Sequence, residues 1–244
     1  THYSFSKGST QQNYPNSLMG AVALLKQSFL DADWYFQNKG KINEVNLSLE
    51  AINNNKSLPK IIEVRDKIRV LLAQKVGREM NYDFIIKGTG DEYQRLNEIK
   101  KNKSKLIVPI NFPKAYNVDD PFKNNNLSLS QLKHWEIAPS NFFFLESQGI
   151  DFSITTNGLS NLRDFRKNLL KSLNRGVSKE ALLKSLTYNP SEFLNVHDKI
   201  GSIKKSFYAN FFITDRDFFD EESKILSNWV KGSWNRVTTY NNKN

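Results

Sequence analysis

Residues 151–232 read DFSITTNGLSNLRDFRKNLLKSLNRGVSKEALLKSLTYNPSEFLNVHDKIGSIKKSFYANFFITDRDFFDEESKILSNWVKG. A short β run ends in a turn at Asn157-Gly158, and two helical segments follow it. Asn189-Pro190 opens a third short helix, because proline suits a first helical turn and restricts the residue before it. Gly201 then turns the chain into a strand, an acidic loop and a final strand. This order predicts a strand and helices followed by a short β segment.

Upstream of this stretch, short apolar runs alternate with segments of helical periodicity. Helices are predicted over residues 18–38, 45–53, 65–80, 92–101, 127–135 and 139–149. Strands are predicted over residues 59–64, 82–87, 105–110 and 151–156, and loops over residues 1–14 and 111–126. Strands separated by helices of this length indicate βαβ units and a parallel sheet. A complete (β/α)8 barrel, one way of closing such a sheet, has eight strands and typically ~250 residues, and the strands predicted here would be half of it with a tail. We therefore expect a piece of a longer polypeptide.

Composition narrows the classes of function. The sequence contains no cysteine, which excludes disulfides, zinc–thiolate sites and a cysteine nucleophile. The net charge of +10 suggests anionic partners, but the basic residues are scattered, and the densest cluster, residues 100–105, reads as an exposed helix end. No apolar run is long enough for a transmembrane helix. We expect no nucleic-acid partner and no membrane span. The start lacks a signal-peptide pattern, and the compartment, periplasmic (exported) or cytoplasmic, is left open.

Several motifs occur in a fixed order near the end of the chain. They are Leu186-Thr187-Tyr188-Asn189-Pro190, Ile200-Gly201-Ser202-Ile203, residues 209–215 (ANFFITD) and Trp229-Val230-Lys231-Gly232. Together they resemble the ending of amidohydrolase-superfamily proteins, especially the imidazolonepropionase-like branch. Residues 7–20, 87–93 and 109–113 are similar to segments of the same proteins. The resemblance implies an α/β fold, a partial (β/α)8 TIM-type barrel over residues 1–195 and a composite β-sandwich segment over residues 196–244.

The resemblance also implies a chemistry, metal-dependent hydrolysis of C–N bonds of the non-peptide, amide type. A divalent metal such as zinc lowers the pKa of a bound water so that hydroxide attacks an amide-like carbon. The family's usual ligands are a His-x-His pair after the first strand, a Lys or Glu on a middle strand, two further His and an Asp after the last strand. Most of these ligands are missing from this sequence, whose histidines, His2, His134 and His197, do not stand at ligand spacing.

Four residues at the ends of predicted strands remain as candidates. Glu63 is a candidate ligand or base, and equally a structural salt-bridge partner. Lys87 is a candidate carbamylated ligand, with a plain pocket-lining role favoured. Asn111 ends the next strand, and Asn157 follows the last one near the family's Asp position, but an amide is a poor metal ligand. We expect these residues to line the pocket, with Glu63 and Lys87 as the catalytic candidates and no metal ligand assigned.

The predicted function is therefore that of an amidohydrolase-like unit with a degenerate metal site, inactive on its own. The alternative is a non-catalytic ligand-binding or scaffolding domain of a larger multi-unit protein. Its partners would be a small-molecule substrate or ligand, the remainder of the parent chain, or a second copy.

Overall fold

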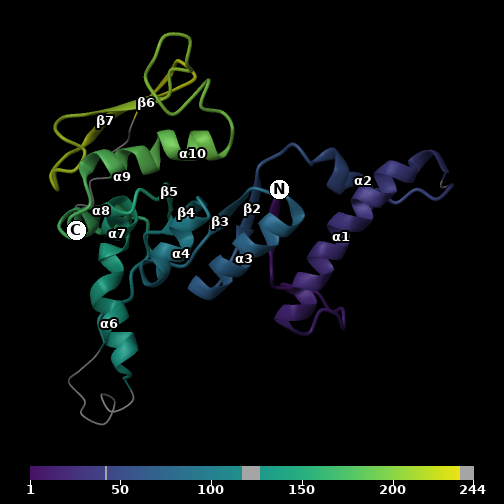
Figure 1. Ribbon diagram of the computed structural model, residues 1–244. Coiled ribbons are helices and arrows are strands. Elements are labelled where there is room, and N and C mark those ends of the chain that lie inside the picture. The colour runs from purple at the N-terminus through teal and green to yellow at the C-terminus, as the bar shows by residue number, and fades with distance from the viewer. Residues whose placement is uncertain (42, 117–126, 237–244) are drawn as a thin grey trace. The chain divides into compact units, whose positions relative to one another are not determined.

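A computed structural model describes residues 1–41, 43–116 and 127–236 (Figure 1). Residues 117–126 of the predicted loop and residues 237–244 of the predicted β-sandwich segment lie outside the described residues. The chain divides into two compact units, Thr1–Ile107 and Val108–Asn244. The expected domain division between residues 195 and 196 stays a prediction.

The α/β class is confirmed by strands that alternate with helices. The strand order of the larger sheet is β1-β2-β3-β4-β5, and β4 crosses the division between the units. In the first unit the pairs β1–β2, β2–β3 and β3–β4 are parallel, as in a partial barrel. The elements of this unit, with the start of β4, are β1 (His2–Ser4), α1 (Leu18–Asn38), η1 (Lys39–Lys41), α2 (Leu47–Asn54), β2 (Lys60–Glu63), α3 (Lys67–Met80), β3 (Phe84–Lys87), η2 (Glu92–Arg95), α4 (Leu96–Lys101) and β4 (Lys105–Pro109).

Strand β1 corrects the prediction that residues 1–14 form a loop. It has three residues, and it pairs in register with β2 from His2 opposite Ile61 to Ser4 opposite Glu63. The amide of Ile61 donates to the carbonyl of Thr1 at 2.8 Å. So short a strand carries no alternation that could be recognised in the sequence.

The two faces of the first unit's sheet differ in burial. Successive strand residues point to opposite faces. Ile62, Ile86 and Leu106 are at most 1% exposed. On the same face Tyr3 and Phe84 contact the ring of Phe29 from α1, with ring centroids 5.4 and 6.5 Å away. The opposite face carries the less buried residues Ile61, Glu63, Lys87 and Ile107. The helices therefore cover one face, and the polar strand-end residues stand on the other.

The second unit holds the last parallel-sheet strand, a helical layer and a small antiparallel sheet. Its elements are α6 (Leu129–Ile137), η3 (Ala138–Ser140), α7 (Asn141–Ser147), β5 (Phe152–Thr155), α8 (Asp164–Leu173), α9 (Lys179–Leu186), α10 (Tyr188–Phe193), β6 (Phe211–Thr214), β7 (Ile225–Val230) and β8 (Ser233–Arg236). Phe142 of α7 is fully buried and stacks on Phe152 of β5 at 5.3 Å between ring centroids. The predicted C-terminal β segment is confirmed as the sheet β6-β7-β8, in which β8 adds a strand to the two that were predicted.

Two polar side chains hold the second unit's irregular segments. Arg166 of α8 donates to the backbone carbonyls of Phe218, Asp220 and Ser223, and so fixes the acidic loop between β6 and β7. Asn189 lies inside α10, and its side-chain amide donates to the carbonyl of Phe152 at 2.7 Å. Asn189, which the sequence places at the start of this helix, therefore also links α10 to β5.

No helix among the described residues has the length and apolarity that a membrane crossing requires.

We predict that Asn189→Ala lowers the free energy of unfolding by about 1–3 kcal/mol, because it leaves the buried carbonyl of Phe152 without its donor. Chemical denaturation followed by circular dichroism measures the change. The matched control is Asn235→Ala on β8, where the exposed side-chain amide donates to the carbonyl of Ser233 two residues away, and we expect a change within about 0.5 kcal/mol. Equal effects of the two substitutions would contradict the stabilising role of the hydrogen bond from Asn189 to Phe152.

Candidate functional site

The carboxyl ends of the first unit's strands bring polar side chains to one edge of the sheet. Glu63 is the last residue of β2 and Lys87 is the last residue of β3, and the parallel register sets them opposite each other. Ser4, the last residue of β1, stands opposite Glu63 on the other side. In barrels of this kind the functional groups lie at this edge, because the loops after the strands surround it.

Glu63 and Lys87 form an ion pair. The distance from Glu63 Oε2 to Lys87 Nζ is 3.3 Å, and the side chains are 41% and 18% exposed. His2 Nε2 lies 3.9 Å from the same carboxylate oxygen, with a side chain 55% exposed. Pairs with this exposure contribute ~0–1 kcal/mol to stability. The main consequence is electrostatic, because the positive charge of Lys87 neutralises the negative charge of Glu63 at this edge.

A small cavity adjoins Glu63 at the ends of β1 and β2. Its volume is about 140 Å³, and it is lined by Ser4, Phe5, Ser6, Leu18, Glu63, Val64, Arg65 and Arg69. The guanidinium of Arg65 donates to Ser6 Oγ at 3.0 Å, while Arg69 pairs with Asp66, the N-cap residue of α3. Hydroxyl and guanidinium donors thus dominate the polar wall of this cavity.

A buried carboxylate shapes the loop directly after Lys87. Glu92 is fully buried, and its Oε1 accepts from the amides of Thr89 at 2.8 Å and Gly90 at 3.1 Å. A Cβ at residue 88 would stand 1.9 Å from that oxygen, so the close approach requires Gly88. Asp91 adds to the loop by accepting from the hydroxyl of Thr89 at 2.7 Å. The sequence interpretation missed Glu92; the signal was a Gly-Thr-Gly turn followed two residues later by a carboxylate.

Asn111 and Asn157 belong to the second unit. Residues 157 and 158 form the predicted turn after β5, in which the backbone amide of Asn157 donates to the hydroxyl of Thr155 at 3.3 Å. Gly158 has φ +83°, and a Cβ there would lie 2.7 Å from Asn111 Nδ2. Asn111 therefore lies against this turn, which glycine keeps open.

The predicted site residues thus come together as two pairs, Glu63 with Lys87 and Asn111 with the turn at Asn157-Gly158. Of the remaining histidines, His134 lies on α6 and His197 is exposed in the turn that follows α10. In the parts of the chain that the structure describes, no three His, Asp or Glu side chains are grouped so that they could hold a metal ion.

The sequence assigns a class to this chain, and solved structures share its fold. The sequence pattern of the amidohydrolase family matches residues 43–239, and the chain belongs to this family. An amidohydrolase from Thermotoga maritima MSB8 has a similar structure, with a TM-score of 0.72 and 20% sequence identity over 91% of this chain and 57% of that chain.

More distant structures share the fold. One is a prolidase complexed with N-methylphosphonate-L-proline, with a TM-score of 0.55 and 9% identity over 78% of this chain and 48% of that chain. Another is phenylurea hydrolase B, with a TM-score of 0.50 and 14% identity over 77% of this chain and 45% of that chain. The chain spans about half the length of the solved structures that it matches. No curated protein matches it. The finer prediction of an imidazolonepropionase-like branch stays a prediction.

We predict that Glu92→Ala exposes the loop after β3 and lowers the free energy of unfolding by about 3 kcal/mol, since two backbone donors lose a buried carboxylate. Hydrogen exchange at the amides of Thr89 and Gly90 should accelerate. Glu92→Gln keeps an acceptor oxygen and should lie between the wild type and Ala. The control is Glu98→Ala, which removes a half-exposed ion pair with Arg95 and should cost less than ~1 kcal/mol. Unchanged exchange at Thr89 and Gly90 in Glu92→Ala would contradict the assignment of Glu92 as the acceptor for these two amides.

Proposed function

We propose that this chain is a half-barrel unit of an amidohydrolase-type protein, and that its own strand ends do not carry out the metal-dependent C–N hydrolysis that the family resemblance implies. The observation that supports this proposal is the Glu63–Lys87 ion pair at 3.3 Å. At the edge where the family's chemistry is expected, a carboxylate is already paired with an ammonium group.

The donor set at these strand ends does not fit a divalent metal. A divalent cation prefers carboxylate, imidazole or other unprotonated donors, whereas an ammonium group offers three N–H donors and no acceptor. The positive charge of Lys87 would also repel a cation bound to Glu63. A lysine binds metal only after carbamylation of its Nζ, and Lys87 Nζ instead lies 3.3 Å from Glu63 Oε2 as the cation of an ion pair.

The strand ends of the second unit offer amides in place of carboxylates. Asn111 presents its side-chain nitrogen toward the position that a Cβ of residue 158 would occupy. Neither Asn111 nor Asn157 can take a proton at neutral pH, so neither serves as a general base. We therefore assign Glu63, Lys87, Asn111 and Asn157 as residues lining the strand ends, without a catalytic role.

Metal analysis tests this proposal directly. After dialysis at neutral pH against a mixture of zinc and manganese, we expect the purified chain to retain far less than one equivalent of either metal, and to hydrolyse no amide-type C–N bond. Lys87→Met removes the ammonium and should raise the zinc affinity at Glu63, whereas Lys105→Met, which breaks the pair with Asp83, should not. Stoichiometric metal together with hydrolysis in the wild type would overturn the proposal.

A non-catalytic ligand-binding or scaffolding unit is the second candidate function. The cavity of about 140 Å³ with Ser4, Ser6 and Arg65 on its wall favours it, because its donors suit a small anion. A thermal-shift screen separates the two classes. A metal-dependent enzyme should be stabilised by zinc or manganese, whereas a binding unit should respond to an anion such as acetate and not to metal.

We also propose a family branch, a C-terminal domain segment and a partner for this chain. The ordered motifs between Leu186 and Gly232 support placement in the imidazolonepropionase-like branch. The antiparallel sheet that begins at Phe211 supports a composite β-sandwich segment over residues 196–244. The remainder of a parent chain or a second copy is the partner that a half-barrel would need.

A further inference from the structure

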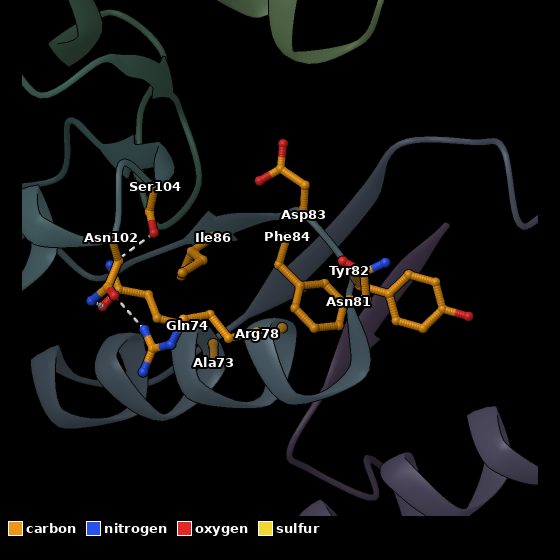
Figure 2. A pocket seen from close by; sticks show the side chains of 11 residues that line it. Ala73, Gln74, Arg78, Asn81, Tyr82, Asp83, Phe84, Ile86, Asn102 and Ser104 are labelled. Atoms are coloured by element: carbon orange, nitrogen blue, oxygen red, sulfur yellow. Dashed lines mark hydrogen bonds between the residues drawn. The ribbon is translucent and has the colours of Figure 1, made fainter.

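A second cavity lies at the opposite edge of the first unit's sheet, by the amino ends of β3 and β4. Its volume is about 300 Å³, at the lower end of the usual range for ligand sites. Figure 2 shows it between α3 and the segments that lead into the two strands. It shares no lining residue with the cavity at Glu63. The two cavities are therefore separate sites.

A chain of hydrogen bonds forms one wall of this cavity. The amide of Gln74 donates to the carbonyl of Ile99 at 3.3 Å and to Ser104 Oγ at 2.8 Å. The amide of Asn102 donates to the carbonyl of Glu98 at 2.8 Å and to Gln74 Oε1 at 3.0 Å. The guanidinium of Arg78 donates to Asn102 Oδ1 (Figure 2).

The direction of each bond in this chain is determined. Backbone carbonyls only accept, so the contacts with Ile99 and Glu98 fix which end of each side-chain amide carries the nitrogen. Both N–H groups of Gln74 and both of Asn102 are then used. Their oxygens also have donors, from Asn102 and from Arg78 respectively.

The groups left over at the two ends of the chain are donors. Ser104 Oγ accepts from Gln74, which leaves its own O–H free to donate. Arg78 uses one nitrogen on Asn102 and has further N–H groups on the rim. Among the described residues Arg78 pairs with no carboxylate, and its neighbour Glu79 pairs with Lys26 and Lys75 instead. This wall therefore presents donors and a positive charge.

The rest of the cavity is apolar or electrically balanced. Ala73, Phe84 and Ile86 line it and are 0%, 4% and 1% exposed. Asp83 also lines it, but its carboxylate lies 3.1 Å from Lys105 Nζ. The carboxyl end of α3 adds a partial negative charge of about half an elementary charge, which the full charge of Arg78 outweighs.

We propose that this cavity binds a small organic carboxylate. The carboxylate accepts from the guanidinium of Arg78 and the hydroxyl of Ser104, and the apolar body of the ligand lies beside Phe84, which keeps a small exposed surface on this side. Arginine suits this role because its planar fork matches a carboxylate. The part-buried hydrogen bonds of Gln74 and Asn102 position the acceptor that the exposed guanidinium of Arg78 uses, so the guanidinium is partly oriented before the ligand binds, which lowers the entropic cost of binding.

Titration of the full chain with sodium butyrate tests this proposal by nuclear magnetic resonance. We expect saturable shifts of the side-chain amide signals of Gln74 and Asn102. Butyramide has the same shape but carries no charge and adds donors to a donor wall, so it should bind at least about tenfold more weakly. Inorganic phosphate lacks an apolar body and should also bind more weakly than butyrate.

Variants of Arg78 complete the test. Arg78→Gln should weaken butyrate binding at least about tenfold. Lys75→Gln removes the same charge from an exposed position of the same helix and should leave binding unchanged. If Arg78→Gln does not fold, Arg78→Lys keeps the charge, loses the fork and should still weaken binding measurably. The proposal is overturned if the Arg78 variants bind as the wild type does, or if butyramide or phosphate binds as tightly as butyrate.

Discussion

The parallel register of β1 to β4 is the constraint on which the first unit depends. It places Ser4, Glu63, Lys87 and Ile107 in one row, because partners in a parallel ladder share a face. A shift by one residue would move Glu63 to the helix-covered face, where Ile62 and Ile86 are almost fully buried, and would bury a charge. The same hydrophobic alternation that holds the sheet together therefore also decides which charges meet at its edge.

The two edges of this sheet carry opposite kinds of polar environment. At the carboxyl ends a carboxylate and an ammonium group neutralise each other, 3.3 Å apart. At the amino ends a network of amides orients an arginine that pairs with no carboxylate of the described residues. The first arrangement opposes the binding of a cation, and the second favours an anion. The same sheet of this amidohydrolase-family chain therefore has an ion pair at one edge and an arginine held by side-chain amides at the other.

Buried and part-buried polar side chains fix the segments between the regular elements. Glu92 satisfies the amides of Thr89 and Gly90, Asn189 satisfies the carbonyl of Phe152, and Arg166 satisfies carbonyls of the loop before β7. Each case follows from the cost of leaving a buried backbone group without a partner. Glu92 acts within three residues, beside a Gly-Thr-Gly turn that gives a local signal, whereas Asn189 and Arg166 act over 37 and 57 positions, where no local pattern distinguishes them from other polar residues.

The sequence by itself determined the class of fold, most strand and helix positions, and the family motifs between Leu186 and Gly232, because periodicity, proline and glycine act locally. It also identified Glu63 and Lys87 as strand-end residues. Only the tertiary structure decided that these two pair with each other, that residues 2–4 form a strand, and that Gln74, Arg78 and Asn102 make one network. Those outcomes depend on strand register and on contacts between elements that are distant in sequence. A local sequence pattern does not determine which of these elements meet.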